Sequence, residues 1–71
     1  MITVNIREEE EFIKLGQALK KASLVGSGVD AKFVIADGLV TVNGEVETRR
    51  GRKLYSGDVV SYQGEKVNIV K

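Results

Sequence analysis

The amino-acid sequence predicts an α+β domain in which two short helices pack on one side of a small, mostly antiparallel sheet. Residues 8–22 repeat apolar residues at spacings of three and four, which is the period of a helix, and a second, shorter helix is indicated between Ser27 and Gly38. Shorter stretches at residues 2–6 and 66–70 alternate apolar and polar residues, as half-buried strands do, and residues 59–62 also indicate a strand. No crossover of the strand–helix–parallel-strand type is evident.

The first helix is expected from Glu8 to Ala22. Four acids, Glu8–Glu11, stand at its start, and Lys20 and Lys21 stand in its last turn, so the charges agree with the direction of the helix dipole. We therefore interpret these acids, here called the acidic block, as helix capping rather than as a binding site. The apolar stripe of this helix consists of Phe12, Leu15, Leu19 and Ala22.

The second helix is expected after a Gly- and Ser-rich turn at residues 23–28. Ser27 and Asp30 stand three residues apart, which is typical of a capping box at a helix N-terminus. Gly38 suits the left-handed conformation that ends many helices. Phe33 lies on the apolar stripe of this helix, so it is expected in the core, as is Phe12 of the first helix.

The dipeptide Asn43-Gly44 between two β-prone segments indicates a hairpin. A two-residue turn would set Val40 opposite Glu47, whereas a three-residue loop with a bulge would pair Val40 with Val46. We favour the second register, because it keeps apolar partners together on one face of the sheet.

Composition excludes several classes of protein. The chain has 71 residues, 42% of them hydrophobic and 30% charged, so we expect one globular domain, residues 1–71, that acts as a monomer. Without Cys or His it cannot form a disulfide, a thiolate or imidazole metal site, or the usual nucleophile–base pairs. We therefore expect a non-enzymatic protein without a cofactor, a metal or a small-molecule substrate. No apolar run approaches the roughly 20 residues that span a bilayer, and no signal segment is evident, so a cytoplasmic location is expected.

The formal net charge of +1 hides a strong segregation of charge along the chain. The acidic block contributes −4, so the remaining residues carry +5. Four cations follow within five residues, namely Arg49, Arg50, Arg52 and Lys53. Such a cluster is typical of a surface that binds a polyanion, although charge runs are also common on solvated faces. Because an unpaired cation is costly to bury, we expect all four at the surface, where they can be neutralised with little harm to the fold.

An ordered set of residues from Lys14 to Gly44 resembles the RNA-binding domain named after ribosomal small-subunit protein four, here called the S-four domain. That family reads R-L-D, a helix, and then S-R-x-x-A-x-x-x-I-x-x-G-x-V-x-V-N-G. Lys14-Leu15 stands at the start of the motif, and the match needs no gap. The matching positions in its second part are Ser27, Ala31, Ile35, Gly38, Val40, Val42, Asn43 and Gly44. The whole chain is similar to the small stand-alone members of that superfamily, the YaaA/YbcJ type.

The resemblance implies an S-four-like alpha-L fold, whose two helices and hairpin present an L-shaped surface to structured RNA, ribosomal or transfer RNA by expectation. Two departures each remove a charge: Gly28 stands where the family commonly has an RNA-contacting Arg, and Gly16 where it has Asp. Gly28 cannot make the RNA contact of the family arginine, and we expect the basic cluster after the hairpin to offset the loss of that contact. The candidate RNA-binding residues are Lys14, Lys21, Ser27, Lys32, Asn43, Arg49, Arg50, Arg52 and Lys53.

Some alternatives stay open. Ser27 can be a helix cap instead of an RNA contact, and Tyr55 beside the basic cluster can contact a base. Because aromatic residues are scarce, we expect recognition by shape and backbone more than by sequence. A ubiquitin-like β-grasp carrier is disfavoured, because the sequence ends Ile69-Val70-Lys71 instead of Gly-Gly. A protein-interaction adapter that binds an acidic protein also fits the basic cluster.

Overall fold

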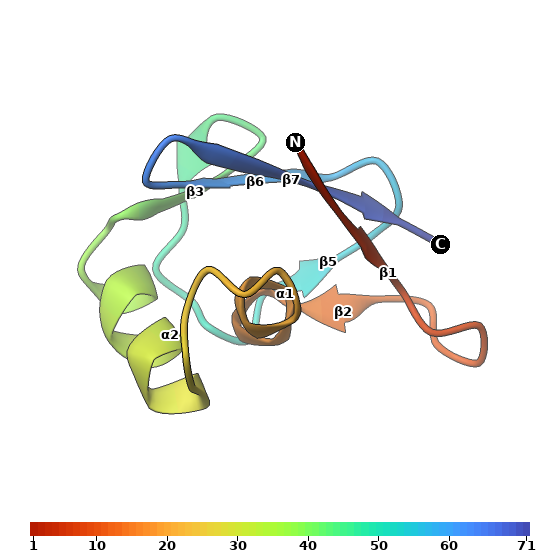
Figure 1. Ribbon diagram of the computed structural model, residues 1–71, viewed down its shortest axis with the longest axis horizontal. Coiled ribbons are helices and arrows are strands. Elements are labelled where there is room, and N and C mark those ends of the chain that lie inside the picture. Colours follow the sequence, from red (N-terminus) through yellow and green to blue (C-terminus); the bar gives the residue numbers. More distant parts are fainter.

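The computed structural model describes residues 1–71 and contains a five-stranded sheet with two helices and a small β-ribbon beneath one face (Figure 1). The strands of the sheet are, in spatial order, β1 (Ile2–Asn5), β7 (Glu65–Val70), β6 (Val59–Tyr62), β3 (Val40–Val42) and β4 (Glu45–Val46). The ribbon pairs β2 (Ile13–Lys14) with β5 (Lys53–Leu54), and the helices are α1 (Leu15–Lys21) and α2 (Gly28–Ala36). Neither helix is long and apolar enough to cross a membrane. The predicted α+β class is confirmed.

The two ends of the chain lie side by side at one edge of the sheet. β1 runs parallel to β7 with Val4 opposite Ile69, whereas the other strand pairs are antiparallel. The Ile6 N–H continues this pairing by donating to the Val70 carbonyl at 2.7 Å. The sheet is therefore mostly antiparallel as predicted. Its one parallel pair could not be seen in local patterns, because it joins opposite ends of the chain.

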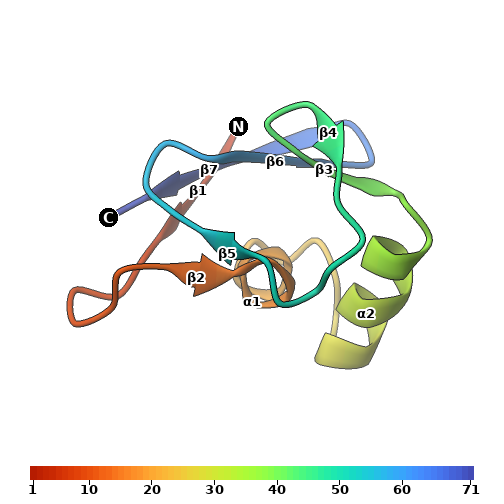
Figure 2. The same cartoon turned by 180° about the vertical axis from the view of Figure 1, so that it is seen from behind.

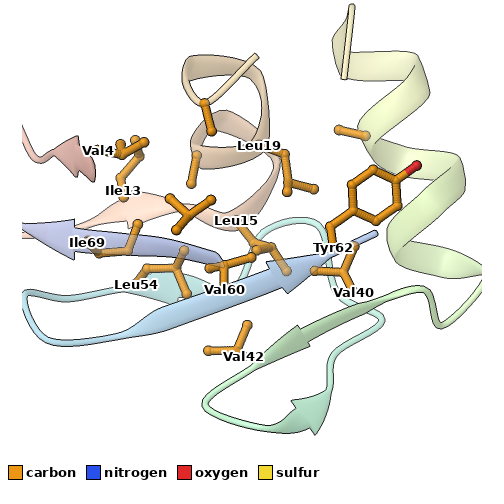
Figure 3. Close-up of a cluster of buried hydrophobic side chains, with 14 of the residues drawn as sticks. Val4, Ile13, Leu15, Leu19, Val40, Val42, Leu54, Val60, Tyr62 and Ile69 are labelled. Carbon is orange, nitrogen blue, oxygen red and sulfur yellow. The ribbon is translucent and has the colours of Figure 1, made fainter. Parts of the chain in front are cut away.

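A core of 16 buried apolar residues holds the sheet, the ribbon and both helices together (Figure 3). Leu19 of α1, Ile35 of α2, Leu54 of β5 and Val60 of β6 are all completely buried. Burial of each such side chain stabilises the fold by about 1.5–3 kcal/mol. Both helices, β5 and β6 are thus anchored in one core.

α1 begins at Leu15, not at the predicted Glu8. Ile13 and Lys14 form a strand instead, because they pair with β5 across the ribbon. The acidic block lies in the turn before this strand, and Arg7 approaches two of its carboxylates at 3.7 and 3.9 Å. The block therefore does not cap the helix, and that interpretation was wrong. The helical spacing of the apolar residues does not reveal a strand partner that lies far along the chain.

The boundaries predicted for α2 are confirmed. The Asp30 N–H donates to Ser27 Oγ at 3.1 Å, so Ser27 is the N-cap. Gly38 has a φ of +77°, the left-handed conformation that follows many helices. Both signals are local, which is why the sequence alone locates this helix well.

The two phenylalanines do not lie in the core as expected. Phe33 is 59% exposed, because Ala31 and Ile35, two residues away on either side, occupy the core-facing side of α2. Phe12 is only partly buried and immediately precedes β2. Phe33 therefore lies on the outer side of α2, and Phe12 lies at the surface beside the ribbon.

The hairpin adopts the register that we did not favour. The Asn43-Gly44 turn has two residues with φ of +52° and +86°, and Thr41 pairs with Val46. The Glu47 N–H donates to the Val40 carbonyl at 3.0 Å, so these two residues lie opposite each other. Because opposite residues in a sheet share a face, Glu47 points to the same side as the buried Val40. The preference for apolar partners was misleading here, because a buried carboxylate occupies this face.

We predict that Gly44→Val lowers the free energy of unfolding by about 1–3 kcal/mol, because a β-branched residue is strained at positive φ. Gly51→Ala is the matched control, since Gly51 has no positive φ and open space around its Cα. Thermal unfolding followed by circular dichroism compares the two variants with the wild type. Equal melting temperatures for Gly44→Val and the wild type would contradict the turn assignment.

Candidate functional site

Residues 49–53, here called the basic loop, connect the hairpin to the ribbon. The segment descends from β4 and passes α1 before it enters β5 (Figure 2). The Leu15 N–H donates to the Arg52 carbonyl at 2.9 Å, and the Gly16 N–H donates to the Arg50 carbonyl at 3.0 Å. The first turn of a helix has backbone N–H groups without partners inside the helix, and the loop carbonyls accept from two of them. The backbone of the basic loop is therefore fixed against the start of α1.

Glu47 ties the same loop to the hairpin. Its side chain is only 8% exposed. Arg49 donates two hydrogen bonds to it, with Nη2–Oε1 and Nε–Oε2 distances of 2.9 and 3.0 Å. Arg52 donates to Glu47 Oε1 at 3.1 Å, and the backbone N–H of Arg49 donates to Oε2 at 3.0 Å. The carboxylate thus has four donors, and two of the four cationic side chains of the loop are held by it.

The pKa of Glu47 is lowered from 4.5 to about 2. The largest cause is the side-chain hydrogen bond from Arg49, followed by its backbone N–H, with Arg52 adding to them and burial opposing them. The same contact raises the pKa of Arg49. Glu47 is therefore ionised at neutral pH, and it cancels one of the four positive charges of the basic loop.

The expectation that the whole cluster can be neutralised without harm to the fold must be corrected. None of the four cations is buried, as expected. Arg49 and Arg52, however, are partners of a buried carboxylate. Removing both would leave Glu47 buried and unpaired, which typically costs several kcal/mol. Arg50 and Lys53 form no salt bridge, so neither of them compensates the buried carboxylate of Glu47.

Three shallow hollows adjoin one another along α1 and the basic loop, and together they are here called the basic groove. The first, beside Phe12, shares Gln17 and Lys20 with the second, which lies between the starts of α1 and α2. The second shares Gly51 with the third, which lies on the basic loop itself. Among the residues that line this basic groove, Glu10 is the one acid. Eight of the eleven cationic residues of the chain line it: Arg7, Lys14, Lys20, Lys21, Arg49, Arg50, Arg52 and Lys53.

The basic groove brings together six of the nine candidate residues. They are Lys14, Lys21, Arg49, Arg50, Arg52 and Lys53. Lys32 is exposed on α2 outside the groove, and Ser27 Oγ is occupied by its capping bond. The Asn43 amide donates to Asp58 Oδ1 at 3.0 Å and accepts from the Val59 N–H at 2.9 Å, so this side chain fastens the hairpin to the next turn.

Two cations of the groove, Arg7 and Lys20, were absent from the candidate residues. Lys20 lies three residues after Gln17, and this spacing places both on one side of α1. A search for polar residues at helical spacing would therefore have included Lys20. Arg7 lies in the turn before β2, and no pattern in the sequence distinguishes it from other surface arginines.

Gly16 allows the closest approach between α1 and the basic loop. A Cβ atom at this position would lie 2.7 Å from Arg50 Cγ, well inside van der Waals contact. Gly28 lines the same hollow of the groove, but a Cβ atom there would meet nothing within 4 Å. The absence of a side chain at residue 16 is therefore what lets the stem of Arg50 lie across the start of α1.

The basic groove has no group of His, Cys, Asp or Glu residues that could hold a metal ion. Its polar groups are cations together with one carboxylate and one amide. Such a surface is suited to bind a ligand with many negative charges along its length. Arginine adds a planar fork that can hold two oxygens of one phosphate.

Residues 4–70 match the family model of the S4 domain. The chain belongs to the S4 domain family, which the sequence motif had indicated. It is 50% identical over 56 residues to RlbA of Bacillus subtilis (strain 168), named a probable ribosome maturation protein, and the match covers 79% of each chain. It is also 41% identical over 58 residues to YbcJ of Escherichia coli (strain K12), covering 82% of this chain and 83% of that protein.

The fold is similar to the solution structure of Escherichia coli YbcJ, described as containing an αL motif involved in RNA binding. The TM-score is 0.73 with 37% sequence identity, over 100% of this chain and 89% of YbcJ. The family and this neighbour confirm the predicted S-four-like alpha-L fold, and they displace the ubiquitin-like carrier alternative.

We predict that Glu47→Gln lowers the free energy of unfolding at neutral pH by on the order of 2 kcal/mol. The folded-state pKa of Glu47 is about 2, below the value of 4.5 for a free side chain. Its ionisation therefore stabilises the fold above pH 4.5, and this contribution is lost as the pH falls from 4.5 towards 2. Urea unfolding of both proteins from pH 7 to pH 2 should show their difference shrinking across this window.

Glu45→Gln is the control, because Glu45 is exposed on the same hairpin and forms no salt bridge. Its effect should stay within about 0.5 kcal/mol at every pH. A difference between wild type and Glu47→Gln that does not change with pH would contradict the ionised state of Glu47.

Proposed function

We propose that this protein is a non-enzymatic module that binds structured RNA along the basic groove. The observation that carries the proposal is the composition of the groove, where eight cationic side chains and a single acid line three adjoining hollows. RNA is the polyanion favoured by the family assignment and by the relatives named for RNA binding and ribosome maturation. We further propose that the RNA belongs to the ribosome or its precursors, which the name of RlbA supports.

Rigid placement of the cations favours recognition by shape. The basic loop is held by backbone hydrogen bonds to α1 and by the carboxylate of Glu47. A cation whose backbone is already fixed loses less conformational entropy when it binds a phosphate. Folded RNA presents phosphates and 2′-hydroxyls in a fixed geometry while its base edges are largely hidden, so a rigid basic groove suits such a partner.

The proposal that the protein acts by binding, without catalysis, rests on its side chains. The chain has no Cys and no His, and the groove consists mainly of Lys and Arg. We propose that it works as a single-domain monomer in the cytoplasm, with no cofactor. A protein adapter that binds an acidic protein is the competing proposal. Binding to ribosomal RNA but not to an acidic protein of similar charge separates the two.

We predict that the logarithm of the RNA affinity falls linearly with the logarithm of salt, with a slope between about −3 and −6. Changing Lys14, Lys20 and Arg50 together to Gln should weaken binding at least about tenfold and make this slope shallower by roughly two to three units. The matched control changes Lys32, Lys66 and Lys71 to Gln, because these are the three cations outside the groove. Fluorescence anisotropy with a labelled ribosomal RNA fragment measures the affinity and the salt slope of each protein.

Both triple variants lose the same charge, so a difference between them reports position rather than net charge. The control should retain nearly the wild-type slope. Equal loss of affinity in the two variants would mean that the groove has no special role, and a flat salt response of the wild type would overturn RNA binding along the groove.

We predict that Gly16→Ala weakens RNA binding by about threefold to tenfold, because the new Cβ forces Arg50 to leave its position. Gly28→Ala, in the same hollow but without a steric neighbour, should bind as wild type does. Alanine favours a helix over glycine by up to about 1 kcal/mol, so a loss of binding cannot be ascribed to weaker helix formation. In an Arg50→Ala background, Gly16→Ala should have no further effect on binding, and a full second loss would show that the two residues act independently.

A further inference from the structure

The end of the basic groove beside Phe12 differs chemically from the rest. The hollows on the basic loop and between the helices have no apolar lining residue. The hollow at this end is lined by Phe12 and Ile13, together with the polar side chains of Glu10 and Gln17. Lys20 lines both this hollow and its neighbour. An aromatic and apolar wall is not what a phosphate requires, so this end is suited to another part of a nucleotide.

Phe12 contacts Lys53, the last residue of the basic loop, and Tyr55, which lies two residues further along the chain. Lys53 Nζ lies 4.8 Å from the centre of the Phe12 ring. The rings of Phe12 and Tyr55 are tilted at 58° with their centres 6.1 Å apart. The backbone of Tyr55 is itself fixed, because its N–H donates to Asp58 Oδ2 at 2.8 Å. The Phe12 ring is therefore oriented before any ligand binds.

We propose that this hollow binds the base of an unpaired nucleotide that flanks the structured RNA, with Phe12 as the stacking surface. The inference rests on the proposed RNA binding of the groove and adds a single-stranded element to it. The aromatic ring offers stacking to any base, and the Gln17 amide and the Glu10 carboxylate supply a donor and an acceptor for its edge. Lys20 lies where the phosphate beside this nucleotide would continue into the rest of the groove.

The arrangement makes the RNA ligand a helix with a single-stranded extension rather than a helix alone. The cations of the basic loop bind the backbone of the folded part, and the Phe12 hollow binds one base beyond it. Stacking of a base on an aromatic side chain contributes about 1–3 kcal/mol. An extension should thus raise affinity by roughly fivefold to a hundredfold.

The test compares three forms of one ribosomal RNA stem-loop: blunt, with a five-nucleotide single-stranded extension, and with an extension of abasic nucleotides. The wild-type protein should bind the extended form more tightly by the factor above, and the abasic form should lose most of this gain although its phosphates are kept. Equal gains from the normal and abasic extensions would overturn the proposal, because the gain would then be electrostatic.

Protein variants test whether the gain in affinity from the extension depends on Phe12. Phe12→Leu keeps an apolar side chain but removes the ring, so the ratio of its affinities for the extended and the blunt stem-loop should fall towards one. Phe33→Leu is the matched control, because Phe33 is exposed on α2 outside the groove, and it should keep the gain. A Phe12→Leu protein that keeps the gain would refute the assignment of Phe12.

The melting temperature of Phe12→Leu is measured first. If this variant does not fold, the comparison of normal and abasic extensions with wild-type protein decides the question. Failure of the wild type to bind even the blunt stem-loop would instead refute the proposed function. The two failures are therefore distinguishable.

Discussion

The ion pair between Glu47 and the two arginines Arg49 and Arg52 is the interaction on which the shape of the candidate site depends. The two-residue hairpin turn directs Glu47 to the inner face of the sheet, where an isolated carboxylate would be costly. Arg49 binds both oxygens of this carboxylate, and Arg52, three residues later in the chain, binds one of them. The chain between them must therefore fold back onto the hairpin. A buried acid thus determines where a basic surface is displayed.

This pairing also explains how so many cations can be close together in a small domain. Four positive charges within five residues repel one another, and the carboxylate reduces that repulsion without removing the field that the groove presents. The carbonyls of Arg50 and Arg52 accept hydrogen bonds from the start of α1, so the loop is anchored on two sides. The acidic block is distant in sequence from the loop, and its carboxylates approach Arg7 and Lys71 instead.

The elements predicted well from sequence are those whose signals are local. α2 is bounded by the Ser27 cap and by Gly38, and both are read from a few adjacent residues. The start of α1 was missed, because only the pairing of residues 13–14 with β5 shows that they form a strand. The hairpin register was missed for a related reason. An inward-facing Glu is reasonable only when its two arginine partners are known to reach it, and local patterns do not contain that information.

The candidate site also combines residues with local signals and residues without them. Charge and motif mark the cluster at residues 49–53 and Lys14 in the sequence, so these residues could be named as candidates before the structure was known. The placement of Phe12 beside Tyr55 and the approach of Arg50 to Gly16 required the tertiary structure, since each joins segments that are more than thirty residues apart. The structure connects the two departures from the family pattern, Gly16 and Gly28. Gly28 leaves open a hollow whose wall includes Arg50, and Gly16 removes the side chain that would have kept Arg50 away. Arg50 of the basic loop therefore lines the hollow beside the position where the pattern has its arginine.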